Sequence, residues 1–338
     1  SWEDVFATLA TKSELSAPQI EWAMNEILEG ASSTENTKRF LLALKEKGET
    51  ADEVNSLVDC MYRKASLIEI PDRAVDIVGT GGDGANTINI STTAAIITTA
   101  AGARTIKHGN RAASSQCGTA DVLEALGVRI DLDPADVARC VVEAGMGFCF
   151  AQKFHPAFRH AGPTRKEIGV PTAFNLLGPM ANPANVSFMV VGVGDPRAAE
   201  KMARAIASRG VERAWIVHGH GGLDELSLSG PCSVVEVRDN ALSEFTINAV
   251  DLGLQPADVT AVRGGDPAHN AQVVLDTFNG QLGPVRDIVV LNAAAGLTVA
   301  GVASSMEEGV SLAQASIDNG SAIRVVEALK VSSNAVAR

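Results

Sequence analysis

Residues 74–93 of the chain read AVDIVGTGGDGANTINISTT, and this stretch decides the fold. The apolar run 74–78 has the length of a buried strand and leads into the glycine-rich turn 79–84. Six residues further on, the hydroxyl side chains of 91–93 are of the kind that begins a helix. A strand, a glycine turn and a helix in this order predict the first unit of a parallel α/β sheet.

Short apolar runs and helical stretches alternate along the rest of the chain. Helices are expected at 133–144 and 196–208, between runs that are typical of strands. The further expected strands are 103–106, 146–150, 186–193, 213–217 and 287–291. This alternation predicts an α/β fold with a largely parallel sheet and helices on both of its faces.

The residues before 74 show helical periodicity and no strand pattern. The apolar positions between Ile20 and Leu28 recur at helical spacing after Ser16, and Thr50 and Glu53 form a capping box before a second apolar face. The segment 154–183 interrupts the α/β rhythm and is rich in Pro, His, Arg and Asn. It either returns to the helical unit or belongs to an active site.

Composition and charge exclude several classes of function. The 338 residues are 46% hydrophobic and 20% charged, which suits about two folded domains and excludes disorder. The net charge of −12 argues against nucleic acid or an anionic membrane surface as the main partner. No run approaches the roughly 18 apolar residues that span a bilayer. The five cysteines form no CxxC pair, so we expect neither disulfides nor a thiolate zinc site, but a cytoplasmic protein.

The turn 79–84 predicts a phosphate cradle. Glycines let the backbone approach a ligand closely, and exposed amides beside a helix N-terminus attract an anion. The turn also matches the GxGxxG motif of dinucleotide-binding Rossmann domains. In that fold the helix begins inside the motif and an acidic residue ends the second strand, whereas this chain has the basic segment 107–111 there. A Rossmann domain and a tight turn without a ligand remain the less favoured interpretations.

The segment Lys107-His108-Gly109-Asn110-Arg111 is expected at the carboxyl end of the second strand, on the same sheet edge as the glycine turn. Small hydroxyl residues at 114, 115 and 119 follow it and add donors for a phosphate. Two anion-binding turns are therefore expected to face one crevice. The alternative, a solvated basic loop, is less favoured because the chain as a whole is acidic.

Two further clusters carry charge. The second basic cluster consists of His155, Arg159, His160, Arg165 and Lys166. The planar fork of an arginine suits a carboxylate, although spacing alone does not choose which arginine binds one. Asp224 and Glu225 follow the expected strand 213–217, and adjacent carboxylates near phosphate cradles favour Mg²⁺. His218 and His220 could suggest zinc, but the cysteines supply no matching pair.

Taken together, these motifs resemble the anthranilate phosphoribosyltransferase family of tryptophan biosynthesis over nearly the whole chain. The resemblance rests on 79–83, 89–92, 107–111, 159–165, 175–179 and 222–225. It implies a small all-helical domain at 1–72, to which about 163–183 returns, packed on a larger α/β domain. That larger domain, formed by 73–162 and 184–338, would bind phosphoribosyl pyrophosphate on a mostly parallel sheet flanked by helices. A homodimer through the helical domains and about two Mg²⁺ ions per subunit are also implied.

The resemblance implies roles for individual residues as well. The implied magnesium ligands are Ser91, Asp224 and Glu225. The implied contacts of phosphoribosyl pyrophosphate are Gly79, Gly82, Asp83, Thr87, Asn89, Ile90, Ser91, Thr92, Lys107, His108, Gly109, Asn110, Arg111, Ser114, Ser115 and Thr119. The implied catalytic residues are Asn110, Arg165, Lys107 and His108, and Asn110 and Arg165 are the ones expected at anthranilate.

The expected reaction is attack of the anthranilate amine on the anomeric carbon of the ribose, with pyrophosphate leaving. An aniline-type amine is already neutral at pH 7, so no strong general base is expected. A pyrimidine nucleoside phosphorylase is an alternative, although its relatives carry Lys-His-Ser at the basic loop and lack the Asp-Glu pair. A second alternative is a non-catalytic nucleic-acid-binding relative, which would need a continuous basic face.

Overall fold

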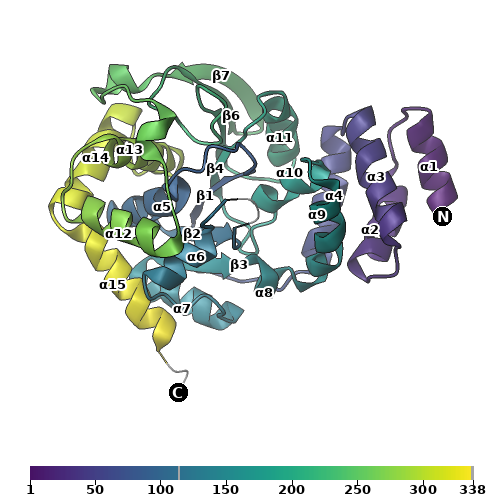
Figure 1. Cartoon of the computed structure of the whole chain (residues 1–338), viewed down its shortest axis with the longest axis horizontal. Helices are drawn as coiled ribbons and strands as arrows, with labels where there is room; N and C mark the ends of the chain where they lie inside the picture. The colour runs from purple at the N-terminus through teal and green to yellow at the C-terminus, as the bar shows by residue number, and fades with distance from the viewer. Residues whose placement is uncertain (113–114, 336–338) are drawn as a thin grey trace.

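Residues 1–112 and 115–335 are described by the structure, a computed structural model of the chain. Figure 1 shows two parts, a bundle of N-terminal helices at one end and a larger α/β body around the central sheet. This arrangement confirms the predicted fold class. Among the described residues, no helix is both long and apolar enough to cross a membrane.

The body is built on a seven-stranded sheet with the order β3-β2-β1-β4-β5-β6-β7. The strands are β1 (Val75–Gly79), β2 (Thr105–Gly109), β3 (Met146–Phe150), β4 (Phe188–Gly192), β5 (Arg213–His218), β6 (Cys232–Arg238) and β7 (Ala241–Ile247). β1 to β5 are parallel to their neighbours among these five strands. β6 pairs antiparallel with β5, and β7 pairs antiparallel with β6. The order reverses between β1 and β4, and such a switch point opens a crevice at the carboxyl ends of the strands.

Helices cover both faces of this sheet. Those of the body are α5 (Ile90–Ala100), α6 (Thr119–Ala125), α7 (Pro134–Ala144), α8 (Ala151–Phe154), α11 (Arg197–Ala207), α12 (Pro267–Phe278), α13 (Pro284–Val299), α14 (Met306–Asp318) and α15 (Ser321–Asn334). Short 3₁₀ helices occupy Pro156–Ala161, Ala249–Leu252 and Val259–Val262. Right-handed connections put α5 on one face and, after the reversal of strand order, α11 on the other (Figure 1).

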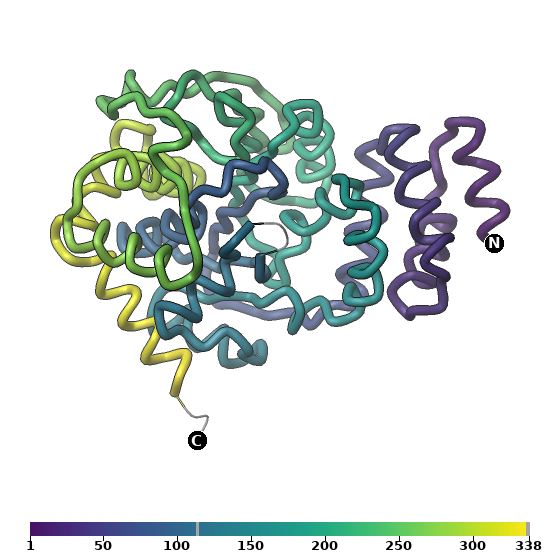
Figure 2. The backbone as a smooth tube through the Cα atoms, viewed as in Figure 1, coloured from purple at the N-terminus to yellow at the C-terminus, as the bar shows by residue number. Residues whose placement is uncertain are grey.

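The small domain is a bundle of helices capped as its sequence predicts. Its N-terminal helices are α1 (Trp2–Ala10), α2 (Ala17–Leu28), α3 (Thr34–Lys47) and α4 (Ala51–Arg63). Ser16 is the N-cap of α2, and the Thr50–Glu53 capping box begins α4. Two later helices, α9 (Gly162–Ile168) and α10 (Ala173–Met180), pack against α3 and α4. Figure 2 shows this return of the chain to the N-terminal helices; the domain boundaries at 72, 163 and 183 remain a prediction.

Two expectations about the sheet were incomplete or wrong. The apolar run 287–291 is not a strand but lies inside α13, whose residues from Ile288 to Val299 are all buried. A helix surrounded by protein on every side has no polar face, so a short part of it looks like a buried strand. The hairpin of β6 and β7 was missed, although its turn residues Asp239 and Asn240, with φ of 51° and 62°, are typical of a two-residue hairpin.

Candidate functional site

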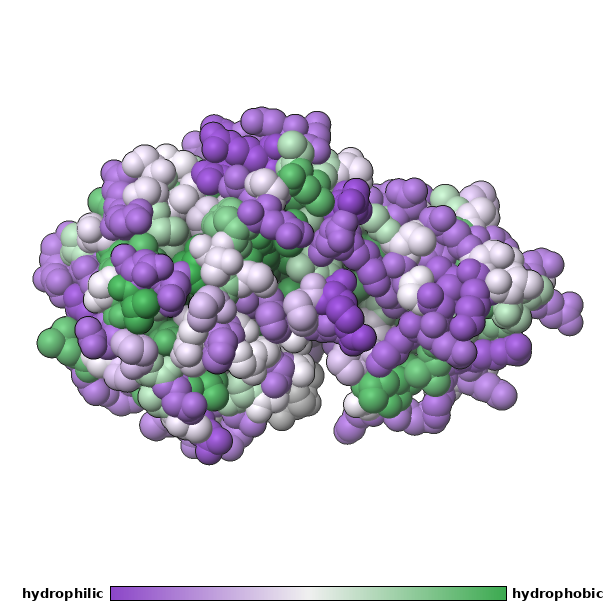
Figure 3. Space-filling view, turned by 90° about the horizontal axis from the view of Figure 1, so that it is seen from above, coloured by the Kyte–Doolittle hydropathy of each residue, from purple (hydrophilic) through white to green (hydrophobic). Residues whose placement is uncertain are grey.

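The crevice at the switch point holds a cavity of about 670 Å³ between the ends of β1 and β2 and the helices α8 to α10. Seen from above, the surface narrows where the α/β body meets the helical domain (Figure 3). Of the predicted site residues, those that line the cavity are Gly79, His108, Gly109, Asn110, Arg111 and Arg165. Residues that lie far apart in the chain are thus neighbours at one sheet edge.

The glycine turn contacts both this cavity and a group of acidic side chains. Gly81, Gly82 and Gly84 have φ of 68°, 78° and 69°, a region that other residues rarely adopt. The Thr80 N–H donates to the Gly192 carbonyl at 2.9 Å, which ties the turn to the end of β4. The helix α5 begins only at Ile90, so a long loop precedes it, in contrast to a Rossmann motif.

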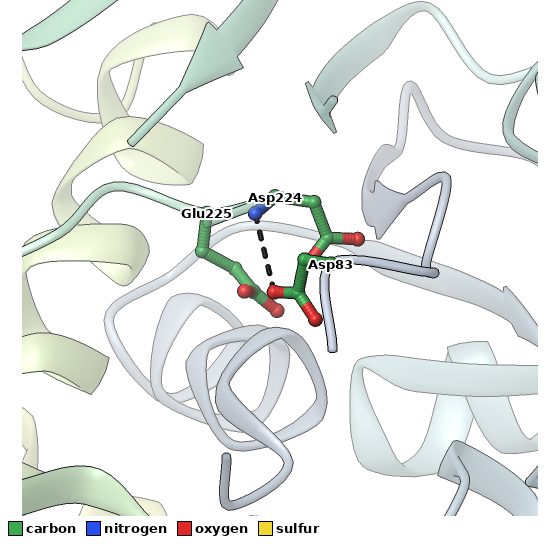
Figure 4. Close-up of side chains that lie close together, drawn as sticks. All are labelled: Asp83, Asp224 and Glu225. Carbon is green, nitrogen blue, oxygen red and sulfur yellow. Dashed lines mark hydrogen bonds between the residues drawn. The ribbon is translucent and has the colours of Figure 1, made fainter. Parts of the chain in front are cut away.

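Asp83, a residue of the turn, forms an acidic cluster with Asp224 and Glu225 (Figure 4). One carboxylate oxygen from each lies within 4.8 Å of the others. The Gly81 N–H donates to Asp224 Oδ2 at 2.7 Å, and the Asp224 N–H donates to Asp83 Oδ2 at 3.4 Å. Glu225 Oε2 is buried and has no hydrogen-bond partner among the described residues.

Burial and mutual repulsion disturb the acid–base behaviour of this cluster. Burial, reinforced by the charge of Asp83, raises the pKa of Asp224 to about 6. Burial and the charge of Asp224 raise the pKa of Glu225 well above its ordinary value. Three crowded carboxylates with an orphaned oxygen are the hard ligands that Mg²⁺ prefers, so these residues fit that ion. Asp83 was expected at the sugar donor only, and its place beside the Asp-Glu pair is an addition.

Two glycines make room for Asp224 at the switch point. A Cβ at Gly192, the last residue of β4, would lie 1.5 Å from the Asp224 carbonyl oxygen. A Cβ at Gly79, the last residue of β1, would lie 2.3 Å from Asp224 Oδ2. Only glycine at these two strand ends therefore lets the acidic loop pass close to the sheet.

Lys107 lies beneath the acidic cluster, away from the cavity. The residue is 1% exposed, and its Nζ donates to the Ile77 carbonyl at 2.7 Å. Burial lowers the pKa of Lys107, while the charges of Asp76, Glu225 and Asp224 oppose that shift. In this conformation it acts as a buried counter-charge, so its predicted contact with the sugar donor stays a prediction.

His108 lines the cavity, and a hydrogen bond fixes its ring. Its Nδ1 lies 3.1 Å from the Gly178 carbonyl oxygen, and because a carbonyl only accepts, Nδ1 carries the proton. The buried Nε2 then has a free lone pair and no partner among the described residues. Burial, with help from His155 and Lys107, lowers the pKa of His108 to about 3. The imidazole is therefore neutral at pH 7.

Arg165 is the half-buried cation among the arginines that line the cavity. It lies on α9, and its guanidinium carbon sits 5.3 Å from the centre of the Phe158 ring. Burial lowers its pKa, but a guanidinium remains charged at neutral pH. In the part of the chain that the structure describes, no carboxylate lies within ion-pair distance of it. Arg159 also lines the cavity but is exposed and donates to the Pro156 carbonyl at 3.4 Å.

Comparisons with known proteins agree with this geometry. Residues 3–65 match a glycosyl transferase family helical bundle domain, and residues 71–323 match a glycosyl transferase family a/b domain. Anthranilate phosphoribosyltransferase of Nocardioides sp. is 47% identical over 332 residues, which cover 97% of each chain. The chain belongs to the anthranilate phosphoribosyltransferase family.

Solved structures of this family have the same fold. The anthranilate phosphoribosyltransferase of Thermus thermophilus superposes with a TM-score of 0.92 and 39% identity, covering 98% of this chain and 100% of that one. The enzyme of Saccharomyces cerevisiae, 26% identical and with 99% of both chains covered, gives 0.90 in a complex with PRPP and Mg. A complex of the yeast enzyme with 4-fluoroanthranilate gives 0.89.

The remaining predicted site residues lie in the loops after β1 and β2 and at the starts of α5 and α6. Thr92 Oγ1 donates to Thr119 Oγ1 at 3.2 Å, which joins the start of α5 to the start of α6. Arg111 is held by Asp121 and Glu124 of α6, so its charge is already paired. The backbone of Thr87 pairs with that of Arg263. Gly82 and Ser115 lie in these loops, Ile90 and Ser91 form the first turn of α5, and Ser114 lies outside the described residues.

Sequence reasoning missed a buried asparagine that supports both loops. Asn270, on α12, is 1% exposed and donates from Nδ2 to Asn89 Oδ1 at 2.9 Å. Asn89 in turn donates to the Cys117 carbonyl at 3.1 Å, on the loop before α6. The only signal in the sequence was a polar residue on an otherwise apolar helix face, which does not say what it bonds.

Proposed function

We propose that this protein transfers the phosphoribosyl group of 5-phosphoribosyl 1-pyrophosphate to the amine of anthranilate, giving N-(5-phosphoribosyl)anthranilate and pyrophosphate in tryptophan biosynthesis. One observation carries the proposal. An acidic cluster that suits a divalent cation shares one glycine turn with a cavity whose Arg165 has no carboxylate partner among the described residues; Gly79 of the turn lines the cavity, and Asp83 of the turn belongs to the cluster. The first suits a diphosphate bound with a cation, and the second suits an acidic aromatic amine.

Asp224 and Glu225, with Ser91 and the neighbouring Asp83, are the residues that we propose for Mg²⁺, with about two ions per subunit. Bound there, the metal would neutralise charge that develops on the leaving pyrophosphate. The chain itself contributes amide donors from the loops after β1 and β2, which hold phosphate oxygens. Lys107 limits the repulsion among the carboxylates from beneath.

We assign the donor to the family positions on the two loops. These are Gly79, Gly82, Asp83, Thr87, Asn89, Ile90, Ser91, Thr92, Lys107, His108, Gly109, Asn110, Arg111, Ser114, Ser115 and Thr119. The Thr92–Thr119 and Asn89–Cys117 hydrogen bonds support a single donor site spanning both loops, because they fix the loops relative to each other.

The cavity would hold and orient anthranilate. Arg165 would take the carboxylate through its fork, because the guanidinium has no carboxylate partner within the described residues. His108 would contribute a neutral imidazole to the wall of the cavity. Asn110, which also lines the cavity, lies at its sheet-side wall. Catalysis would then consist of positioning and stabilisation of the leaving group, without a strong base.

The setting of the enzyme is also part of the proposal. We propose that it acts in the cytoplasm as a homodimer joined through the helical domains, with small-molecule substrates and neither nucleic acid nor membrane as a partner. All five cysteines are buried free thiols, which agrees with a reducing compartment.

The deciding experiment mixes the protein with anthranilate, phosphoribosyl pyrophosphate and Mg²⁺ and follows anthranilate fluorescence. We expect a steady decline that requires all three components and stops when a chelator removes the metal. Phosphate-dependent release of a free base from thymidine or uridine, without this decline, would favour a nucleoside phosphorylase. Salt-sensitive retention of DNA without transfer would favour the nucleic-acid-binding alternative.

A further inference from the structure

Asn292 is a buried polar residue in the middle of an apolar helix. It lies on α13, where every residue from Ile288 to Val299 is buried, and it is itself 1% exposed. An amide buried without partners would destabilise the fold by about 1–3 kcal/mol. The hydrogen bonds that Asn292 makes therefore show which part of the molecule it serves.

Two of its three bonds go to a single residue of another loop. Asn292 Oδ1 accepts from the Leu226 N–H at 2.9 Å, and Nδ2 donates to the Leu226 carbonyl at 2.9 Å. The third bond, also 2.9 Å, goes from Nδ2 to the Ile288 carbonyl of its own helix. Both amide hydrogens of Asn292 are thus used. Its two hydrogen bonds to the backbone of Leu226 satisfy the N–H and the carbonyl of that residue, as a neighbouring strand would.

Leu226 directly follows the acidic pair Asp224–Glu225. On the other side of the pair, the Gly219 N–H donates to the Leu223 carbonyl at 2.8 Å. Packing there is also close: a Cβ at Gly192 would meet the Asp224 carbonyl at 1.5 Å, and one at Gly219 would meet the Glu225 carbonyl at 2.1 Å. The acidic pair thus lies between one backbone hydrogen bond at Leu223 and the two directional bonds of Asn292 at Leu226, which fix it from both ends.

We propose that Asn292 is a positioning residue for the metal-binding carboxylates Asp224 and Glu225. By holding both backbone groups of Leu226 against the rigid α13, it sets the direction in which the Glu225 side chain leaves the loop. The inference rests on the proposed function, in which the acidic cluster binds Mg²⁺. Residues that orient metal ligands from behind typically change metal affinity about 10- to 100-fold when removed.

The test compares Asn292→Leu and Asn292→Ala with wild type. Mn²⁺ binding is measured by electron paramagnetic resonance of the free ion, with phosphoribosyl pyrophosphate present and anthranilate absent. Thr298→Val is the matched control, because Thr298 is buried on the same helix and bonds the Ala294 and Ser305 carbonyls, away from the acidic loop. We expect Mn²⁺ affinity to fall about 10- to 100-fold in both Asn292 variants, and the control to bind as wild type does.

Steady-state kinetics separates this role from general damage. At saturating Mg²⁺ the KM for anthranilate should change less than about threefold in the Asn292 variants, because the cavity does not touch Leu226. Variants that bind Mn²⁺ as tightly as wild type would overturn the inference. Wild-type protein that binds no Mn²⁺ in the presence of phosphoribosyl pyrophosphate would instead overturn the proposed function of the cluster.

A measurement on the unaltered protein covers the case in which the variants do not fold. The Leu226 amide should be strongly protected from hydrogen exchange, since its acceptor is the Asn292 side chain inside the protein. Exchange as fast as that of exposed loop amides, such as those around Gly221, would show that the two bonds do not hold the loop and would overturn the inference.

Discussion

The acidic cluster and the Arg165 cavity share the glycine turn but carry unbalanced charge of opposite sign. In the cluster, three carboxylates crowd together and burial raises the pKa of Asp224 to about 6. In the cavity, Arg165 is partly buried beside Phe158 with no carboxylate near it in the described residues. Each region is stabilised by a ligand of opposite charge, so the contrast indicates two separate recognition tasks for one reaction.

Neutralising the acidic side should have the largest effect. The double variant Asp224→Asn, Glu225→Gln removes the charges that we assign to the metal, and metal stabilisation of a leaving group amounts to several kcal/mol. Transfer activity should fall by about 10³-fold or more and should respond little to added Mg²⁺. The measurement is the fluorescence assay over a series of Mg²⁺ concentrations. Glu244→Gln, which changes an exposed carboxylate on β7, is the control. Near-normal rates in the double variant would show that this cluster does not bind the metal.

Arg165→Ala should affect the other region alone. A hydrogen bond to a charged group contributes about 1.5–3 kcal/mol, so the KM for anthranilate should rise about 10- to 100-fold, while that for phosphoribosyl pyrophosphate changes much less. The KM for anthranilate of Arg165→Lys should lie between those of wild type and Arg165→Ala, because lysine keeps the charge but lacks the planar fork of arginine. The adjacent exposed Lys166→Ala is the control. An equal rise in KM for both substrates would show that Arg165 does not serve anthranilate alone.

Asn270→Leu should weaken the donor side by a smaller amount. It removes the bond to Asn89 that supports both phosphate loops, and a neutral hydrogen bond contributes about 1 kcal/mol. We expect the KM for phosphoribosyl pyrophosphate to rise about fivefold with little change for anthranilate. Gln272→Leu, an exposed amide on the same helix that bonds only Asp276, is the matched control. A shift in the anthranilate KM instead would show that the two regions are mechanically coupled.

The local signals in the sequence predicted the parts of the site that depend on backbone chemistry. The strand at 74–78, the glycine turn at 79–84 and the helix opened by 91–93 follow from which residues tolerate which conformation. The structure has β1 at Val75–Gly79 and begins α5 at Ile90. The sheet edge shared by 79–84 and 107–111 follows from parallel topology. These features are local or topological, so one sequence is enough to predict them.

Features that depend on three-dimensional packing were not predictable in this way. The run 287–291 looks like a strand because full burial removes the polar face of α13. Asp83 joins the pair at 224 and 225 only because Gly79 and Gly192 let that loop approach. Asn270 and Asn292 are buried polar residues, and the partners that matter for the site, Asn89 and Leu226, are far away in sequence. Spacing carries no information about such contacts.

The smallest expected effect concerns the stability of the metal-free protein. A carboxyl group whose pKa is raised from 3.8 to about 6 binds its proton more tightly in the folded state, so its ionisation opposes folding as pH rises through that range. Asp224→Asn removes this penalty, while its side-chain oxygen can still accept from the Gly81 N–H. The melting temperature without metal should therefore rise by a few degrees at about pH 7.5 and hardly change at about pH 4.

With Mg²⁺ and phosphoribosyl pyrophosphate added, wild type should have a higher melting temperature than Asp224→Asn. The ligands would then stabilise wild type by mass action and the Asp224→Asn variant much less. The measurement is differential scanning calorimetry at both pH values, with and without the ligands, and Glu244→Gln is again the control. A lower melting temperature for metal-free Asp224→Asn at the higher pH would mean that Lys107 already compensates the cluster, and the contrast with the Arg165 cavity would then be one of shape rather than of unbalanced charge.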